Sequence, residues 1–204
     1  MTAMTMITEA HMERGIAATA AAGPEDARPY RRGDLVVYPT HGVGTVDRIG
    51  VEEIGGEKLR LIQVSFAENQ MTLRIPVTKA AAIGLRRPST RKALEEVLTV
   101  LAGRSHASKT VWVKRAQEYV LRINSGSIKA LAAVVRDLRP GLDGSGSSFS
   151  QRNLFEIAID RLASEFAAVF KMEKAAALRR LTQILHSGAG TGAFDVDAEN
   201  AIQG

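Results

Sequence analysis

The sequence contains no cysteine, which excludes disulfide bonds, thiol catalysis and cysteine-ligated zinc or iron–sulfur centres. Aromatic residues make up only 5% of the 204 residues, and there is a single tryptophan, Trp112. No uninterrupted apolar run approaches the roughly 20 residues that span a bilayer, so we expect no membrane partner. The segment Met1–Met12 also lacks the basic and apolar regions of a signal peptide.

The sequence also lacks the residue patterns that are typical of an enzyme. No two histidines have the spacing of metal ligands on one helix face, and the four are His11, His41, His106 and His186. Adjacent acidic pairs, such as Glu95 and Glu96, point to different sides of a helix or strand and make poor acid–base pairs. No glycine-rich segment carries a phosphate-loop lysine or a complete dinucleotide fingerprint. We therefore expect no catalytic residues, no metal, no cofactor and no enzymatic activity.

The positive charge of the chain is concentrated in its middle. The net charge is +5, and residues 89–141 carry +6, whereas residues 1–30 carry −2 and residues 187–204 carry −3. Such a positive field favours a polyanion, and binding would then weaken as salt rises. The same surplus of lysine and arginine also fits a solvated helical surface, so charge alone leaves both interpretations open.

Short segments of alternating polarity predict strands in the first half of the chain. They cover residues 35–38, 45–49, 59–66 and 71–75. Pro39 closes the first segment because proline cannot donate a hydrogen bond into a strand ladder. Gly42 and Gly44 bracket the next turn, and Gly55 and Gly56 form a two-glycine hairpin turn. These features predict a small, strongly bent antiparallel β-barrel.

From residue 89 onward the apolar spacing becomes helical. Helices are expected after the capping residues Ser89 or Thr90, Ser127 and Ser148, with further helices over about 111–123 and 173–186. The fold class is therefore α+β, with a β-barrel followed by a compact all-α domain of about five helices. We expect a disordered arm at 1–29, the barrel domain at 30–88, the helical domain at 89–187 and a flexible tail at 188–204.

Trp112 lies among cations at the start of a predicted helix. Lys109, Lys114 and Arg115 flank it, and Arg122 follows on the same helix. A large flat ring beside phosphate-seeking charges suits unstacked or kinked DNA. The ring also has helical spacing to Tyr119, so the sequence equally fits a tryptophan that begins a buried face.

Arg74 is a second candidate, on the last predicted strand. It lies between Leu73 and Ile75, so its side chain points away from these apolar neighbours, onto an exposed face or edge. Both an ordinary solvent-exposed arginine and a protein partner docked on that edge fit this pattern.

Several motifs together resemble one known family. They are segments 33–44, 74–76 and 84–86, Trp112 with Lys114 and Arg115, and segments 125–126, 134–138, 148–152 and 158–165. These motifs are similar to the CarD/CdnL family of bacterial transcription regulators, and the similarity covers about residues 30–172. The resemblance implies a Tudor-like barrel that binds the beta subunit of RNA polymerase and a helical domain that touches promoter DNA.

The resemblance also implies residue roles. Trp112 would wedge into the minor groove at the upstream edge of the melted bubble and stabilise the open complex, while basic residues hold the phosphate backbone. The expected DNA-binding residues are Trp112, Lys109, Lys114, Arg115, Arg122 and Arg152. The expected polymerase-binding residues are Arg74, Glu52 and Thr72. Such a regulator would be a cytoplasmic, nucleoid-associated monomer.

The sequence departs from the family pattern at three positions. Glu52 and Gln117 stand where some members carry a basic residue, and Ser127 stands where aspartate is often found. Two other functions stay open on the sequence. The chain could be a free-standing DNA-binding or architectural protein, or a protein–protein adaptor without DNA contact.

Overall fold

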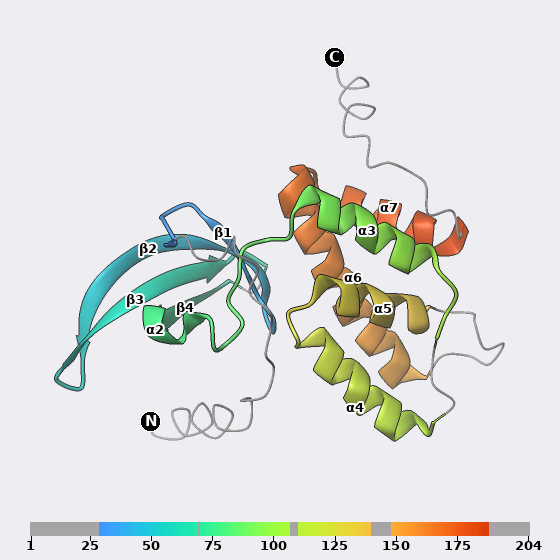
Figure 1. The fold of residues 1–204 in the computed structure, drawn as a ribbon, viewed down its shortest axis with the longest axis horizontal. Helices are drawn as coiled ribbons and strands as arrows, with labels where there is room; N and C mark the ends of the chain where they lie inside the picture. The colour runs from blue at the N-terminus through green and yellow to red at the C-terminus, as the bar shows by residue number, and fades with distance from the viewer. Residues whose placement is uncertain (1–28, 69, 107–109, 140–147, 188–204) are drawn as a thin grey trace, which may run out of the picture.

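The computed structural model describes residues 29–68, 70–106, 110–139 and 148–187. Within these ranges a four-stranded antiparallel sheet is followed by six helices, which confirms the predicted fold class (Figure 1). Five of these helices lie between residues 89 and 187, and the sixth is a short helix directly after the sheet. The expected arm, up to residue 28, and the expected tail at 188–204 lie outside the described residues.

The sheet is an open half-barrel whose strands follow one another in the order of the chain. The strands are β1 (Leu35–Tyr38), β2 (Gly42–Ile54), β3 (Glu57–Phe66) and β4 (Met71–Pro76). Every neighbouring pair is antiparallel. The predicted hairpin turn joins β2 to β3, with φ of +62° at Gly55 and +84° at Gly56. Glycine reaches such angles without steric cost, which explains the two glycines.

Two local features bend β2 against β3. The register shifts between Val46 and Arg48, so Asp47 is the extra residue of a β-bulge, which increases the twist of the strand. Gly44 lies inside β2, not in a turn as the sequence suggested, because the strand already begins at Gly42. A Cβ atom at Gly44 would lie only 2.7 Å from Val64 Cγ1. Glycine is therefore required here by the close approach of two strands.

The concave side of the sheet holds its own hydrophobic core. The short helix α2 (Val77–Ala80) follows β4 directly and contributes to this core. The buried members are Val36, Val46, Ile62, Val64, Phe66, Ile75, Ala80 and Leu85.

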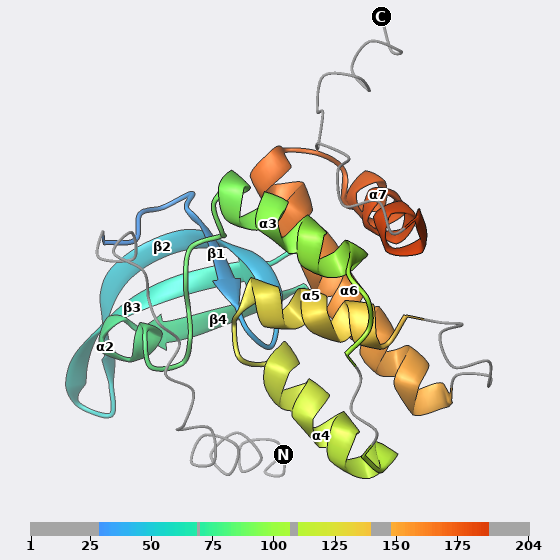
Figure 2. The same ribbon diagram turned by 45° about the vertical axis from the view of Figure 1, so that its right-hand side comes forward.

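The remaining helices form a bundle beside the sheet (Figures 1 and 2). They are α3 (Arg91–Ala102), α4 (Trp112–Ile123), α5 (Ile128–Asp137), α6 (Phe149–Phe170) and α7 (Lys174–Ser187). Three of the predicted caps are confirmed, because the side chains of Thr90, Ser127 and Ser148 each accept a hydrogen bond from the backbone N–H three residues on. Such bonds satisfy donors that a helix N-terminus otherwise leaves open.

The bundle has a second, separate hydrophobic core. The stripes predicted on α3 and α5 are buried, including Leu94, Leu98 and Leu131. Val120 has helical spacing to Ala116 and Ile123 in the sequence, but it is 42% exposed. The reason is that α4 buries only a narrow stripe around Tyr119 and Ile123, and Val120 lies outside it. Two separate cores favour two structural units, and we propose that the barrel domain ends at residue 88 and the helical domain begins at residue 89.

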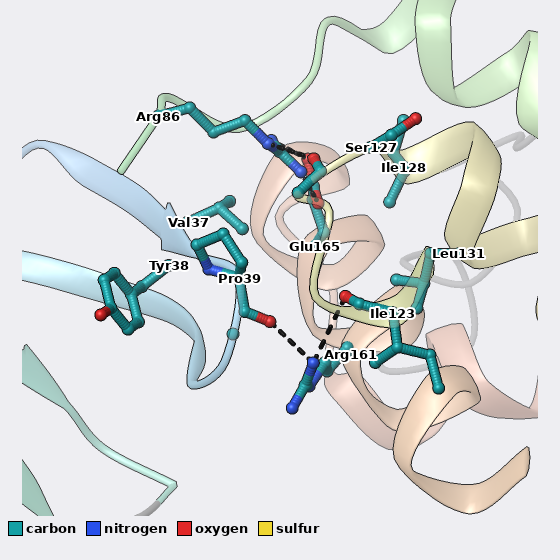
Figure 3. A pocket seen from close by; sticks show the side chains of 12 residues that line it. Val37, Tyr38, Pro39, Arg86, Ile123, Ser127, Ile128, Leu131, Arg161 and Glu165 are labelled. Carbon is teal, nitrogen blue, oxygen red and sulfur yellow. Dashed lines mark hydrogen bonds and ion pairs between the residues drawn. The ribbon is translucent and has the colours of Figure 1, made fainter. Parts of the chain in front are cut away.

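Helix α6 connects the bundle to the sheet through a buried ion pair. Arg86 forms an isolated antiparallel bridge with Val37 of β1, and its side chain reaches Glu165 of α6 (Figure 3). Glu165 is only 2% exposed. It accepts hydrogen bonds from Arg86 Nη1 and Nη2 at 2.7 and 2.8 Å, and from Ser89 N and Oγ at 2.8 and 2.7 Å. The buried charge is therefore fully partnered, as burial of a carboxylate requires.

A second arginine, Arg161 of α6, joins three parts of the chain. The guanidinium of Arg161 donates to the carbonyl oxygens of Pro39 and Thr40 at 2.7 and 2.9 Å, and to Asn124 Oδ1 at 3.0 Å. It thereby holds the β1–β2 turn against the C-terminal end of α4. Arg86 reinforces this arrangement, since its Nε donates to the carbonyl of Gly126 at 2.8 Å. Burial lowers the pKa of Arg161, and arginine nevertheless stays charged in proteins.

A third link connects the β3–β4 turn to α6 and α7. Glu68 accepts hydrogen bonds from Ser164 Oγ at 2.8 Å and from Lys174 Nζ at 2.8 Å, and Lys174 also contacts Asp160 at 2.6 Å. Burial acts to lower the pKa of Lys174, but the two carboxylates outweigh it and the pKa is raised. We call the contacts of α6 with Arg86, with the β1–β2 turn and with Glu68 the sheet–bundle joint. It fixes the two units relative to each other.

Candidate functional site

Trp112 is half-buried at the start of α4, where this helix meets the first turn of α6. Its ring packs against the core of the bundle and lies 6.4 Å from the ring of Tyr119, centroid to centroid. The indole Nε1–H donates to Ser150 Oγ on α6 at 3.0 Å. The sequence left a buried and an exposed ring as alternatives. In the structure the ring is partly buried: one edge is held by Ser150 and the core, and the rest of its surface is accessible.

Three of the predicted DNA-contacting cations lie at this end of the bundle. The Arg115 guanidinium stands 5.7 Å from the centroid of the Trp112 ring, which is a cation–π contact. Lys114 is exposed on the same turn of α4. Arg152 is exposed in the first turn of α6, two residues after the serine that accepts the indole N–H. These cations and Trp112 lie on the first turns of two helices at one end of the bundle, and we call them the cluster around Trp112.

Two predicted DNA-binding residues are not part of this cluster. Arg122 is exposed, but it follows Trp112 by ten residues, which is about 15 Å along the axis of α4. Lys109 lies outside the described residues. Gln117, the position that departs from the family pattern, is exposed on α4.

Phe149 also lies at this end of the bundle, and the sequence analysis missed its exposure. It is the first residue of α6, it directly precedes Ser150, and it is 81% exposed. The sequence signal at this helix start came from the capping residues Ser148 and Gln151, which flank Phe149 and say nothing about its exposure. The available signal was the phase of the helix, because Phe149 lies on the same face as Arg152 and Asn153, which are both exposed. Val111 and Val113, beside Trp112, are exposed as well.

The second candidate site is the outer face of the sheet. Arg74 and Thr72 are exposed on β4, while Ile75 is buried, as the alternation predicted. Arg74 Nη1 lies 3.5 Å from Glu52 Oε2, and Glu52 also pairs with Arg48. The three predicted polymerase-binding residues thus share one surface, although Glu52 is far from the other two in sequence.

Polar pairs continue this surface across β3. Thr72 stands opposite Ser65, and Arg74 stands opposite Gln63. Ser65 Oγ in turn donates to the bulge residue Asp47 at 2.8 Å. Among the described residues β4 pairs only with β3, so its outer edge still offers backbone donors and acceptors. A partner strand could pair with such an edge.

The part of the chain that the structure describes contains neither a metal-binding cluster nor a membrane-spanning helix. There, no three histidine, aspartate or glutamate side chains gather closely enough to hold a metal ion. In the same residues, no helix has the length and apolarity needed to cross a membrane.

Known proteins are similar to both halves of this chain. Residues 30–89 match the family described as CarD-like/TRCF RID domain, and residues 96–182 match the family described as CarD, C-terminal domain. The "Putative transcription factor YdeB" of Bacillus subtilis (strain 168) is 26% identical over 140 residues, which cover 69% of this chain and 92% of that protein.

One solved structure is similar to the first half. The 72-residue N-terminal domain of Myxococcus xanthus CarD, solved in solution by NMR, is 38% identical. The match covers 28% of this chain and 76% of that one, with a TM-score of 0.25.

Proposed function

This chain belongs to the CarD/CdnL family of bacterial transcription regulators, and on that premise we propose how it acts. The family relationship makes it a transcription-related regulator that interacts with RNA polymerase. We propose that the outer face of its sheet binds the polymerase beta subunit. The cluster around Trp112 would contact promoter DNA at the upstream edge of the bubble and stabilise the open complex. The protein would act as a monomer, without enzymatic activity, at the bacterial nucleoid.

The observation that supports this proposal most directly is the way Trp112 is held. Its indole N–H is bound by Ser150 and its ring is accompanied by Arg115, so the ring loses little freedom when it enters DNA. Apolar side chains that insert at a base step stabilise distorted DNA, because only the distorted form offers the cavity. A ring presented in this way would favour the open duplex over the closed one.

The cations around the ring would position it without reading sequence. Contacts of Lys114, Arg115 and Arg152 to phosphates fix orientation but carry no base information. Attachment to polymerase would raise the local concentration of the helical domain at the promoter, so weak DNA affinity suffices. We therefore expect little preference for promoter sequence. The effect should instead follow how readily each promoter bubble closes again.

A Trp112→Ala variant tests the DNA part of the proposal. It should shorten the lifetime of the polymerase–promoter open complex, while binding to polymerase and the far-UV circular dichroism spectrum stay unchanged. Trp112→Phe keeps an apolar ring and should retain part of the effect. An unchanged lifetime would favour the adaptor alternative. Tight, salt-sensitive binding to duplex DNA without polymerase would favour a free-standing DNA-binding protein.

An Arg74→Glu variant tests the polymerase part. It should weaken pull-down of the isolated beta subunit, because it reverses a charge on the outer face and places a second carboxylate near Glu52. Arg60→Glu is the matched control. Arg60 is exposed on β3, but it is three positions from Gln63, so its side chain points to the opposite side of the sheet. Equal retention of the beta subunit by both variants would count against this face.

A further inference from the structure

Phe149 exposes more of its surface than any other large hydrophobic residue in the described ranges, 81% against 72% for Leu121. The exposure does not come from a frayed helix end. Ser148 Oγ accepts from the backbone N–H of Gln151 at 3.3 Å, and Gln151 Oε1 accepts from the backbone N–H of Ser148 at 2.8 Å. This capping box holds the backbone on both sides of the ring. The phenyl group is thus fixed at its base and open to solvent.

The ring also has a defined place relative to Trp112. Ser150, the next residue, accepts the indole N–H, and Ser148 and Ser150 bring their hydroxyl oxygens within 3.2 Å of each other. Phe149 therefore lies at the rim of the surface that presents Trp112. Two aromatic rings from two helices stand at one end of the bundle.

The charge around Phe149 indicates what kind of group would cover it. Arg152 follows three residues later, one turn along the same exposed face. A flat ring with a cation one turn away matches a nucleobase and its phosphate, since bases stack on aromatic side chains while basic residues hold the backbone. Glu156 is exposed two turns from Phe149, so the basic character ends there.

We propose that Phe149 is a second aromatic DNA contact, which stacks on one unpaired base released where the bubble opens. The inference rests on the function proposed for Trp112, and it adds a specific ligand, a base in single-stranded form. Trp112 would fill the gap at the edge of the duplex, and Phe149 would hold a base that has left it.

Substitutions at Phe149 test this proposal through open-complex lifetime with the full-length protein. Phe149→Ala should shorten the lifetime by about tenfold, in line with the loss of one base–aromatic stack. Phe149→Tyr keeps the ring and should behave as wild type, whereas Phe149→Leu keeps apolar volume without the ring and should resemble Phe149→Ala. Leu121→Ala removes a comparably exposed side chain near the far end of α4 and should have no effect.

The outcomes separate this inference from the proposed function. If Trp112→Ala shortens the lifetime and Phe149→Ala does not, stacking by Phe149 is refuted while the function of Trp112 stands. If neither variant has an effect, the proposed function fails as well. A Phe149→Leu variant that behaves as wild type would also overturn stacking.

Photo-crosslinking identifies the partner directly. Phe149→p-benzoylphenylalanine in the polymerase–promoter complex should crosslink to DNA with a preformed bubble and not to fully paired DNA of the same sequence. Crosslinking to a polymerase subunit or to a second copy of this chain, without DNA, would overturn the proposal.

Discussion

The buried pair of Arg86 and Glu165 should dominate the energetics of the sheet–bundle joint. A Glu165→Ala substitution removes a carboxylate that accepts four hydrogen bonds and leaves the Arg86 guanidinium without its counter-charge. Breaking a buried ion pair by removing one partner costs about 3–5 kcal/mol. The side chain of Arg86 keeps 20% of its surface exposed, so water can partly compensate. We therefore expect a loss of about 3 kcal/mol in the free energy of unfolding.

A double-mutant cycle separates the pair from its surroundings. Replacing both partners, as Arg86→Met with Glu165→Leu, leaves no uncompensated charge but removes the acceptor of the Ser89 N–H, so the double variant should lose less stability than the sum of its two single substitutions. The free energies come from urea denaturation followed by the fluorescence of Trp112 and by circular dichroism. Because the sheet and the bundle have separate cores, Glu165→Ala should also broaden or split the transition.

Two results would refute this reasoning. A loss below about 1 kcal/mol for Glu165→Ala would show that the charge is solvated in the folded state. A double variant as unstable as the sum of its single substitutions would show that the two side chains do not interact.

Three further predictions concern single residues. Burial and the Arg161 charge lower the pKa of His41 below its ordinary value of 6.5, so the folded state favours the neutral ring. The stability that this shift contributes is present above pH 6.5 and should be lost as the pH drops through the lowered pKa. His41→Gln should flatten this acid dependence of the melting temperature between about pH 7 and 5; an unchanged slope would assign it to other groups. Ser150→Ala should cost about 1 kcal/mol and shift the fluorescence of Trp112 to the red, because the indole N–H loses its acceptor; an unshifted spectrum would contradict the contact. Gly44→Ala should destabilise the protein by about 1–3 kcal/mol in urea denaturation, because its Cβ would overlap β3, and wild-type stability would show that the strands can separate slightly.

The helices could be predicted from the sequence because their signals are local. A polar cap and an apolar stripe lie within one stretch of chain, so Thr90, Ser127 and Ser148 identified three helix starts. The alternation that exposes Arg74 is equally local. The exposure of Val120 shows the limit of such signals, because the width of a buried stripe depends on which helices pack against it.

The sheet–bundle joint could not be predicted, since its partners are remote in sequence. Arg86 and Glu165 are separated by 79 positions, and Arg161 reaches Pro39 across 122. The sequence contained a signal that the prediction did not use, because Arg161, Ser164 and Glu165 alternate with apolar residues in the second half of α6. Buried polar groups of this kind need partners, and only the folded chain shows that these come from the sheet.

The position of Trp112 was likewise set by a distant element. Its half-burial depends on Ser150, which belongs to another helix, and no spacing within α4 reveals that contact. The pairing of Glu52 with Arg74 on the outer face of the sheet could not be predicted either, because β3 lies between their two strands.

Helix α6 sets the distance between the end of the bundle that carries Trp112 and the sheet. Ser150 near its start holds Trp112, and Arg161, eleven residues later, holds the sheet. Eleven residues complete just over three turns, so the two positions are about 16.5 Å apart along the helix axis and lie on nearly the same face. Inserting one residue between them would rotate one attachment by about 100° relative to the other. The spacing between the two proposed binding surfaces is thus set by the number of residues in α6, and a change in the length of this helix should be tolerated far less than a change in the loops around it.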